Sequence, residues 1–421
     1  MKKTLFTILL QPLEAILASM SEIIDQKSLT QKLFFADFVH KLIFGYVYQV
    51  SSLRNLSLEL QTNPLCAALG LGFTPFSTLK DGFARFESKH FKQLWESLGE
   101  QINLCKVPYL DEIGIFRVID GSLFPTLLAM PWTNYRKTKN AFKLHLSCSL
   151  NRMIPSEFWV GKGNSNERSF LASVVESGLT YLADRGYFSF ALADKLLQAN
   201  AFFIFRGRAN LLYRTVEELV IKQENLPLCF TRVTDEIIIF TSDEKHHKFR
   251  LITFVVAGSY FRLITNRFDL PTLKIIILYA YRWQMELFFK FMKRTLPGLH
   301  LFNHSRNGVE SQFYVLLSVA LLLLKVKQDC QKSEIKADQE IVVEEKSAEN
   351  SRNPSQWIKD IARIFYKSWK ISKNWLVILK NSLAQVVDNP LLDLLNSAWQ
   401  TPCRSVMTKS GKVLMWLYRS L

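Results

Sequence analysis

Residues 113–122 read IGIFRVIDGS, an apolar run that ends in the polar triplet Asp120-Gly121-Ser122. Further short runs of strand-forming residues follow at Phe142–Leu150, Met153–Val160, Leu179–Ala183 and Ala201–Phe205. An amphipathic stretch with helical spacing, Phe188–Ala199, separates the last two runs. Three adjacent strands, followed by helices that alternate with two more strands, predict a mixed sheet of the α/β class.

The first 110 residues have a helical pattern. Apolar residues recur at helical spacing through Leu33–Val50 and Leu53–Leu60, and Pro64 separates a short apolar piece, Leu65–Leu69. A further short helix is expected, capped at Thr74 or Ser77. Two interpretations stay open for this region: a helix-turn-helix that reads DNA and, favoured over it, an ordinary helical bundle.

The segments that follow the predicted sheet differ in character. Residues 210–268 contain the β-rich pieces CFTRV, EIIIFTS, KFRLITFVV and YFRLITN, which predict a mostly β insertion. A long helical pattern begins at Pro271, a residue type that is common in the first turn of a helix. These patterns divide the chain into a helical region over 1–110, an α/β domain with the β insertion over 111–325, a charged linker or solvated helix over 326–356, and a second helical region over 357–421.

The net charge of the 421-residue chain is +16, which points to a polyanionic partner, nucleic acid before an anionic membrane surface. Residues 111–325 carry a net charge of +9 and residues 357–421 carry +7, whereas residues 1–110 carry only +2 and residues 326–356 carry −2. The six cysteines form no C-x-x-C pair, which argues against a disulfide framework or a zinc site and fits a reducing compartment.

No membrane partner is expected. The longest apolar run, Val315–Leu324, is about half of the roughly 20 residues that a membrane span requires. The lysine-containing N-terminus resembles a signal peptide faintly, but Gln11, Pro12 and Glu14 interrupt its apolar part. The expectation is the first helix of a cytoplasmic protein associated with the nucleoid.

Three carboxylates are candidates for a catalytic site. Asp120 and Asp184 each follow a predicted strand, and the carboxyl edge of an open α/β sheet is where ligands bind, although a single Asp there usually caps a turn. On the helix after Pro271, a rotation of about 100° per residue puts Tyr279, Arg282, Glu286 and Lys293 in one narrow stripe. The alternative for that stripe is a structural Arg282–Glu286 ion pair.

Three carboxylates in a basic protein suggest a site for two divalent cations. Hard oxygen ligands suit Mg²⁺, with Mn²⁺ as an acceptable substitute. Two such ions can activate a water or a 3′-hydroxyl and stabilise a leaving oxygen in phosphoryl transfer. Arg282, Lys293 and Tyr279 would then hold the phosphate backbone.

These residues match a known family. The spacing Tyr279-x2-Arg282-x3-Glu286-x6-Lys293 resembles the YREK signature of DDE transposases from the insertion-sequence-four group. IDGSLF at 119–124 and LADRGYFS at 182–189 resemble the first and second aspartate motifs of that family, and residues 265–294 are similar to the segment around its catalytic Glu. The resemblance covers about residues 110–320.

The resemblance implies an RNase H-like core in which Asp120, Asp184 and Glu286 bind Mg²⁺. It also implies cut-and-paste transposition by a homodimer on paired DNA ends, with double-stranded terminal inverted repeats and target DNA as substrates. Tyr279, Arg282 and Lys293 are expected to contact DNA phosphate. Some relatives hold a flipped base with a Trp of the β insertion, but no Trp lies between Trp159 and Trp283 here. The candidate substitutes are Tyr213, Phe240, Phe254 and Tyr260.

Two basic segments add to this prediction. Arg136, Lys137 and Lys139 follow Asp120 in a loop that either contacts DNA or is simply solvated. Residues 357–380 form an amphipathic helical pattern with one basic face, suited to DNA backbone, to a membrane surface or to solvent. Two alternatives to a transposase remain: a non-catalytic basic DNA-binding protein, and a domesticated RNase H-like nuclease without strand transfer.

Overall fold

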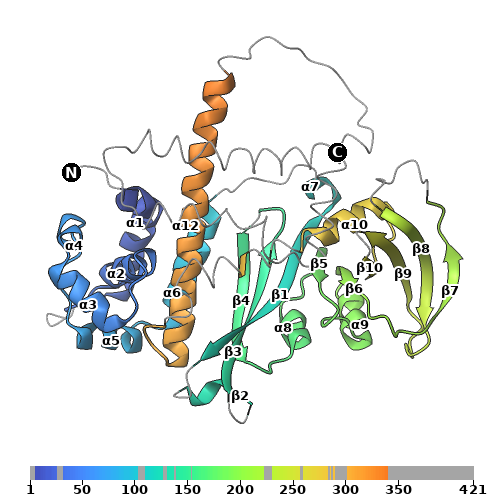
Figure 1. Cartoon of the computed structure of the whole chain (residues 1–421), viewed down its shortest axis with the longest axis horizontal. Coiled ribbons are helices and arrows are strands. Elements are labelled where there is room, and N and C mark those ends of the chain that lie inside the picture. The colour runs from blue at the N-terminus through green and yellow to red at the C-terminus, as the bar shows by residue number, and fades with distance from the viewer. Residues whose placement is uncertain are drawn as a thin grey trace.

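The computed structural model describes residues 5–25, 32–102, 110–126, 130–136, 139–152, 154–221, 230–256, 259–282, 285, 288–289 and 301–339. A ten-stranded sheet runs through these residues (Figure 1). Its strands are β1 (Ile115–Thr126), β2 (Asn134–Arg136), β3 (Lys139–Ser149), β4 (Ile154–Lys162), β5 (Leu179–Ala183), β6 (Phe202–Arg206), β7 (Tyr213–Glu218), β8 (Phe230–Phe240), β9 (Lys248–Val256) and β10 (Ser259–Thr265).

The strand order confirms the predicted mixed α/β sheet. From one edge the order is β2-β3-β1-β5-β6-β10-β9-β8-β7, and β4 also pairs with β3. The β1–β5 and β5–β6 pairs are parallel, whereas β4–β3 and β3–β1 are antiparallel. Two parallel strands beside three antiparallel ones are the arrangement of an RNase H-like core. Helices α8 (Glu167–Ser173) and α9 (Phe190–Gln198) precede and follow β5.

The predicted β insertion is confirmed as β-rich, and its strands continue the same sheet. β10 pairs antiparallel with β6, with Ile264 opposite Phe205. Residues 230–233 of CFTRV and 236–240 of EIIIFTS, expected in separate pieces, lie in the single strand β8, which has a register shift between Thr231 and Thr234. Arg232 within that irregularity has a φ of 52°, as a β-bulge permits. β7 was not predicted, because its sequence YRTVEE is mostly polar and exposed.

Both faces of the central strands are covered, as parallel strands require. On one face, Ile119, Tyr181 and Phe203 pack in a core with side chains of α8 and α9. On the other face, Val118, Leu182 and Ile204 belong to a larger core that includes α10 (Thr272–Ala280). Because side chains alternate along a strand, successive residues of β1 and β5 point first to one of these faces and then to the other.

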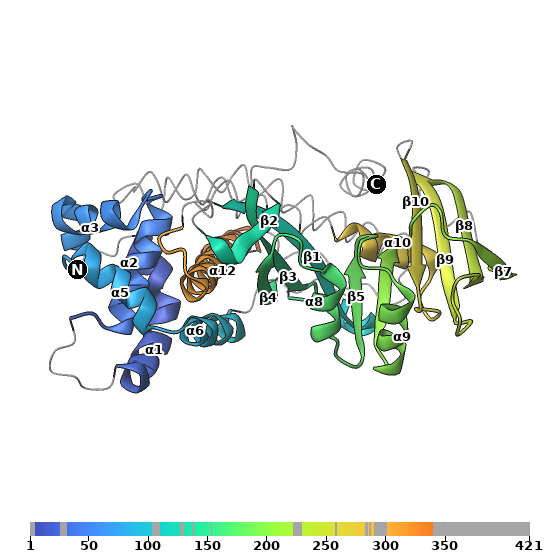
Figure 2. The same cartoon turned by 90° about the horizontal axis from the view of Figure 1, so that it is seen from below.

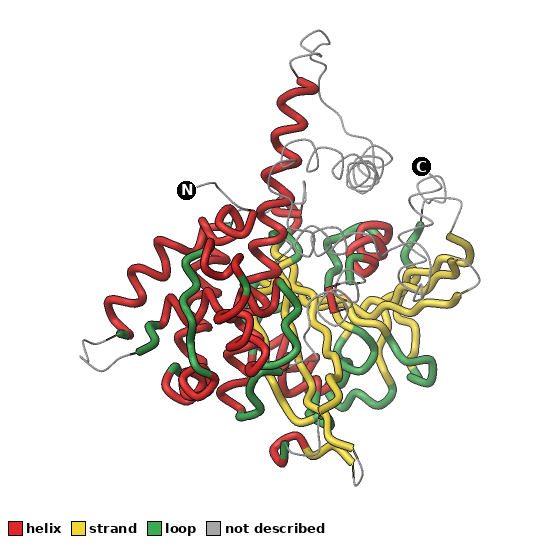
Figure 3. Tube along the Cα trace, turned by 60° about the vertical axis from the view of Figure 1, so that its left-hand side comes forward, coloured by secondary structure: helices red, strands yellow, loops and turns green. Residues whose placement is uncertain are grey.

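The remaining helices form a bundle at one end of the sheet (Figures 2 and 3). They are α1 (Leu5–Ile24), α2 (Phe35–Val47), α3 (Leu53–Thr62), α4 (Pro64–Ala68), α5 (Phe76–Arg85), α6 (Ser88–Gln101) and α12 (Arg306–Gln339), while the short α7 (Leu110–Ile113) leads into β1. α12 packs against α1, α2, α5 and α6, and both α6 and α12 contact β4. The Asn307 side-chain amide donates to the carbonyls of Phe83 and Phe86. Residues far apart in the sequence therefore build one bundle.

The structure bears on two sequence expectations about these helices, and the first of them is wrong. α5 begins after Pro75 with no side-chain cap, so neither Thr74 nor Ser77 caps it. Residue 326, where the charged segment was expected to start, lies inside α12, which continues as one helix to Gln339, so the helical alternative applies to the first part of that segment. Residues 340–421, which include the predicted basic helix 357–380, lie outside the described residues.

Among the described residues, one helix is long and apolar enough to span a membrane by length and composition: Phe6–Ile24 within α1. This segment contains no long uninterrupted apolar run, because Gln11, Pro12 and Glu14 divide it. Its side chains Phe6, Leu9, Leu13 and Leu17 are buried, and the helix packs against α2 and α6. In this fold 33% of the segment is buried inside the protein.

Candidate active site

The strand register brings the two predicted aspartates together. The parallel pairing of β1 and β5 ends with Val118 opposite Leu182, so Asp120 and Asp184 each come two residues after this last pair. Adjacent strands are about 4.8 Å apart, and a step of two residues returns the side chain to the same face. Asp120 therefore lies on the α10 face, as Val118 does. Asp184 occupies the equivalent position next to it, two residues after Leu182 of β5.

The position of Asp120 in its strand differs from the prediction. Asp184 directly follows β5, as expected, but β1 continues past Asp120 to Thr126 because β3 pairs with it there, with Asp120 opposite Leu146. What ends near Asp120 is the parallel pairing and not the strand. The two carboxylates thus lie where β1 and β5 separate, the place where a sheet opens to a ligand.

Local hydrogen bonds fix both carboxylates. Oδ1 of Asp120 accepts the backbone N–H of Gly121 at 2.8 Å, and Oδ1 of Asp184 accepts the N–H of Arg185 at 2.8 Å. The two side chains are 19% and 36% exposed. They are oriented by the backbone and remain within reach of a ligand.

Each carboxylate faces a guanidinium group. Arg282, almost fully buried, places NH1 3.4 Å from Oδ2 of Asp120. Arg206, the last residue of β6, places NH1 3.9 Å from Oδ1 of Asp184. Two positive groups beside two negative ones offset the repulsion between the carboxylates. The same guanidinium groups are suited to binding phosphate oxygens.

Arg206 was not singled out in the sequence, although a signal existed. β5 and β6 are parallel and pair Ala183 with Phe205, so the next residues, Asp184 and Arg206, are level with each other. A charged residue at the end of each of two neighbouring parallel strands predicts such a contact once the strand order is known.

The helix expected to run without a break from Pro271 through the polar stripe is interrupted before Arg282. α10 ends at Ala280, and Tyr281 and Arg282 form a turn. Backbone bonds here span three residues: Arg282 donates to the Tyr279 carbonyl and Met285 donates to that of Arg282. Arg282 reaches Asp120 from this turn. Glu286 and Lys293 lie outside the described residues, so their roles and the alternative Arg282–Glu286 pair stay predictions.

Tyr279 joins the site from α10. Its side chain is buried, and its ring centroid lies 5.9 Å from the guanidinium carbon of Arg282. Burial raises the pKa of Tyr279 to about 12, against the opposing effect of Arg282. The phenol therefore stays protonated at neutral pH and can act as a hydrogen-bond donor. Asp120, Asp184, Tyr279 and Arg282 are thus the predicted site residues that the structure brings together.

The predicted basic loop is only partly described. Arg136 in β2 lies opposite Lys139 in β3 in an antiparallel pair, so the backbone forms a tight hairpin. Lys137 lies outside the described residues, as do the side chains of Arg136 and Lys139. Contact of this hairpin with DNA stays a prediction.

Two carboxylates provide hard oxygen ligands, which fit Mg²⁺ or Mn²⁺. Within the described part of the chain, no group of three His, Cys, Asp or Glu side chains is spaced to hold a metal ion. The third expected carboxylate is Glu286, which is not described. The described pair supplies the type of ligand that a divalent cation needs, and Mg²⁺ binding stays a proposal.

Two of the four residues considered for base stacking are inaccessible. Phe240 and Phe254 are both buried in the cores beside the sheet. Tyr260 is exposed and Tyr213 is half-buried. Of these four residues, Tyr213 and Tyr260 are therefore the two on which an extruded base could stack.

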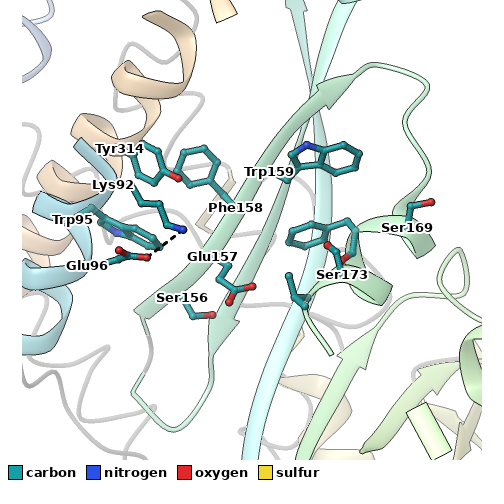
Figure 4. A pocket seen from close by; sticks show the side chains of 12 residues that line it. Lys92, Trp95, Glu96, Ser156, Glu157, Phe158, Trp159, Ser169, Ser173 and Tyr314 are labelled. Carbon is teal, nitrogen blue, oxygen red and sulfur yellow. Dashed lines mark hydrogen bonds and ion pairs between the residues drawn. The ribbon is translucent and has the colours of Figure 1, made fainter. Parts of the chain in front are cut away.

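A separate cavity of about 570 Å³ lies between α6 and α12 on one side and β4 and α8 on the other (Figure 4). Aromatic rings form much of its wall, including Trp95, Trp159 and Tyr314. The lining residues include neither aspartate nor Arg282. The carboxylate site is therefore distinct from this hollow.

Comparison with known proteins fits this geometry. The family model described as the transposase DDE domain matches residues 114–323. Over these residues, the chain belongs to the transposase DDE domain family. This range contains Asp120, Asp184 and the whole segment from Tyr279 to Lys293. The resemblance to DDE transposases is confirmed at the level of the family.

Three relatives named as transposases show moderate identity. A protein of Sinorhizobium fredii is 27% identical over 217 residues, which cover 50% of this chain and 60% of that protein. A protein of Geobacillus stearothermophilus, named for an insertion sequence element, is 23% identical over 46% of this chain and 52% of its own length. One of Synechocystis, also named for an insertion sequence element, is 24% identical over 56% of this chain and 67% of its own length. The aligned parts thus span about half to two thirds of these relatives.

Proposed function

We propose that the chain is the transposase of an insertion element, which cleaves DNA at the element's ends and joins them to target DNA in a cut-and-paste reaction. The observation that carries this proposal is the pair Asp120–Asp184 at the opening between two parallel strands, faced by the buried Arg282. The transposase DDE domain family and the names of the relatives support it.

Each site residue has a distinct part in the proposed reaction. Asp120, Asp184 and Glu286 hold the divalent cations, preferably Mg²⁺. Bound cations supply the Lewis acidity for attack by water or a 3′-hydroxyl on a phosphodiester. Arg282 binds phosphate through its planar guanidinium group, Lys293 acts as a point charge, and Tyr279 donates a hydrogen bond.

The proposed partners are double-stranded DNA and a second copy of the chain. The net charge of +16 favours a DNA substrate. We assign the N-terminal bundle, the hairpin with Arg136, Lys137 and Lys139, and the basic C-terminal region to DNA or subunit contacts. A homodimer on paired terminal inverted repeats, working in the cytoplasm on the nucleoid, completes the proposal.

Cleavage of DNA that carries the inverted repeats flanking the coding sequence tests this function. In Mg²⁺, the wild type should cut at the repeat ends, and Glu286→Gln should lose this cutting because a carboxylate that holds a cation becomes a neutral amide. Glu176→Gln is a matched control outside the site, since Glu176 is half-exposed and pairs with Arg117 at 2.8 Å. Equal cutting by the wild type and Glu286→Gln would refute the assignment of Glu286.

The same assay separates the two competing functions. A non-catalytic DNA-binding protein would bind the repeat ends in Mg²⁺ without cutting them. A domesticated nuclease would cut the ends but would not join them to a target plasmid. Strand-transfer products are therefore the outcome that distinguishes a transposase from both alternatives.

Arg282→Ala should weaken binding to pre-cut ends and reduce the salt dependence of that binding. Loss of one phosphate contact is expected to lower the slope of log K against log salt by about 1. Arg214→Ala, on the edge strand β7, is the matched control because Arg214 is exposed and distant in the sheet order from β1. A fluorescence titration at several salt concentrations measures both slopes, and an unchanged slope for Arg282→Ala would contradict the phosphate contact.

A further inference from the structure

Tyr187 lies three residues after Asp184, in the turn that follows β5. Its backbone N–H donates to the Asp184 carbonyl at 3.0 Å. The side chain is 1% exposed, and its ring packs in the core formed with α8 and α9. The ring thus has an ordinary structural environment, and the hydroxyl is the part that calls for an explanation.

The hydroxyl of Tyr187 is buried and has no hydrogen-bond partner among the described residues. Tyr181 on β5 makes a useful contrast: its hydroxyl accepts the N–H of Glu176 at 2.8 Å and donates to the carbonyl of Val174 at 2.7 Å. Burial of a hydroxyl without a partner costs free energy, and Phe would fill the same volume without that cost. A hydroxyl in this position is useful if a ligand supplies its partner.

The charges around this hydroxyl are those of the candidate active site. Burial raises the pKa of Tyr187 well above its usual value, and the carboxylates of Asp120, Glu167 and Asp184 raise it further, while Arg282 lowers it. A phenol hydroxyl is an ordinary hydrogen-bond donor. The hydroxyl of Tyr279, which is also buried, has Asp184 and Arg282 among its electrostatic neighbours as well. Two phenols from opposite faces of the sheet thus share Asp184 and Arg282 as charged neighbours.

The turn that holds Tyr187 is fixed by the start of α8. Nε of Arg168 donates to the Gly186 carbonyl at 3.1 Å. The Glu167 carboxylate, which accepts Nζ of Lys143 at 2.6 Å, covers Gly186 so closely that a Cβ there would lie 2.4 Å from its Oε2. Only glycine fits this approach without a shift of Glu167. The hydroxyl is therefore held in place before any ligand binds.

We propose that Tyr187 is a further substrate-contacting residue of this site, whose hydroxyl donates a hydrogen bond to a non-bridging phosphate oxygen of DNA held between Asp120 and Asp184. The inference rests on the proposed function, which supplies that phosphate. A phosphate oxygen fits better than the aspartates of the protein, because neither forms a hydrogen bond with Tyr187. Hydrogen bonds to a charged oxygen are the stronger kind.

Tyr187→Phe removes the hydroxyl and keeps the ring. The melting temperature should not fall, because no hydrogen bond within the protein is lost. The single-turnover rate of cutting repeat-end DNA should fall about 10-fold to 100-fold, the effect of losing one hydrogen bond to a charged group. Affinity for the pre-cut duplex in metal-free buffer with EDTA, measured by fluorescence anisotropy, should fall several-fold.

Tyr181→Phe is the matched control. It should lower the melting temperature, because two hydrogen bonds are lost, and leave the cutting rate of the folded protein unchanged. Wild-type cutting and affinity in Tyr187→Phe would overturn the inference, as would losses that merely follow a drop in its melting temperature. If the wild type binds the duplex without cutting it, the proposed function fails and the metal-free affinity alone decides the role of Tyr187.

Discussion

Asp120→Asn and Asp184→Asn should each reduce the rate of DNA end cleavage by about 10³-fold or more, because a ligand charge worth several kcal/mol to the reaction is removed. Asparagine keeps the oxygen that accepts the N–H of the next residue, so the local backbone should be unchanged. Single-turnover kinetics in Mg²⁺ measure the rates. Addition of EDTA to the wild type should have the same effect as either substitution.

The two variants should differ in stability. Asp120→Asn leaves the buried guanidinium of Arg282 beside a neutral group, whereas Arg206 approaches Asp184 only at 3.9 Å and at a more exposed site. A lower melting temperature is therefore expected mainly for Asp120→Asn. Asp194→Asn on α9 is the control, since Asp194 pairs with Lys245 outside the site. Wild-type rates in either active-site variant would refute the carboxylate assignment.

The elements of the central sheet could be predicted from the sequence because short apolar runs mark buried strands. Their ends could not. The apolar run before Asp120 stops at Ile119, but β1 continues to Thr126 because backbone pairing with β3 does not depend on side-chain polarity. For the same reason the polar edge strand β7 has no recognisable pattern. The helix α12 packs against α6 and α2, which are distant from it in the sequence. Hydrophobic periodicity within one segment does not predict such a contact.

The sequence motifs predicted several residues of the site. Contacts that depend on strand pairing could not be predicted from those motifs. Asp120, Asp184, Tyr279 and Arg282 were expected together and are found together. Helical periodicity predicts that α10 continues through Arg282. The helix instead ends at Ala280, and the side chain of Arg282 contacts Asp120, which is 162 positions away in the sequence. Arg206 and Tyr187 were missed because their relation to Asp184 follows from the β5–β6 register and from a buried hydroxyl, neither of which a linear pattern contains.

Loss of the buried ion pair between Arg250 and Asp235 should strongly destabilise the β-rich part of the sheet. Nε of Arg250 on β9 donates to Asp235 on β8 at 2.8 Å, and both side chains are almost completely buried. Arg250 also donates to the carbonyls of Arg267 and Leu270, and Thr272 at the start of α10 donates to Asp235 at 2.6 Å. After Arg250→Ala, Thr272 is the one side-chain donor to the buried carboxylate of Asp235 that remains among the described residues.

Removal of one partner from a buried pair costs about 3–5 kcal/mol in the free energy of unfolding, which urea denaturation followed by circular dichroism can measure. Because this network fastens the start of α10 to β8 and β9, Arg250→Ala should also displace Tyr279 and Arg282 and slow DNA cutting. Arg262→Ala is the control: Arg262 lies on neighbouring β10 and donates to the Ala209 carbonyl at an exposed site, so its loss should cost less than about 1.5 kcal/mol. Equal stabilities of the two variants would show that the buried network does not anchor α10.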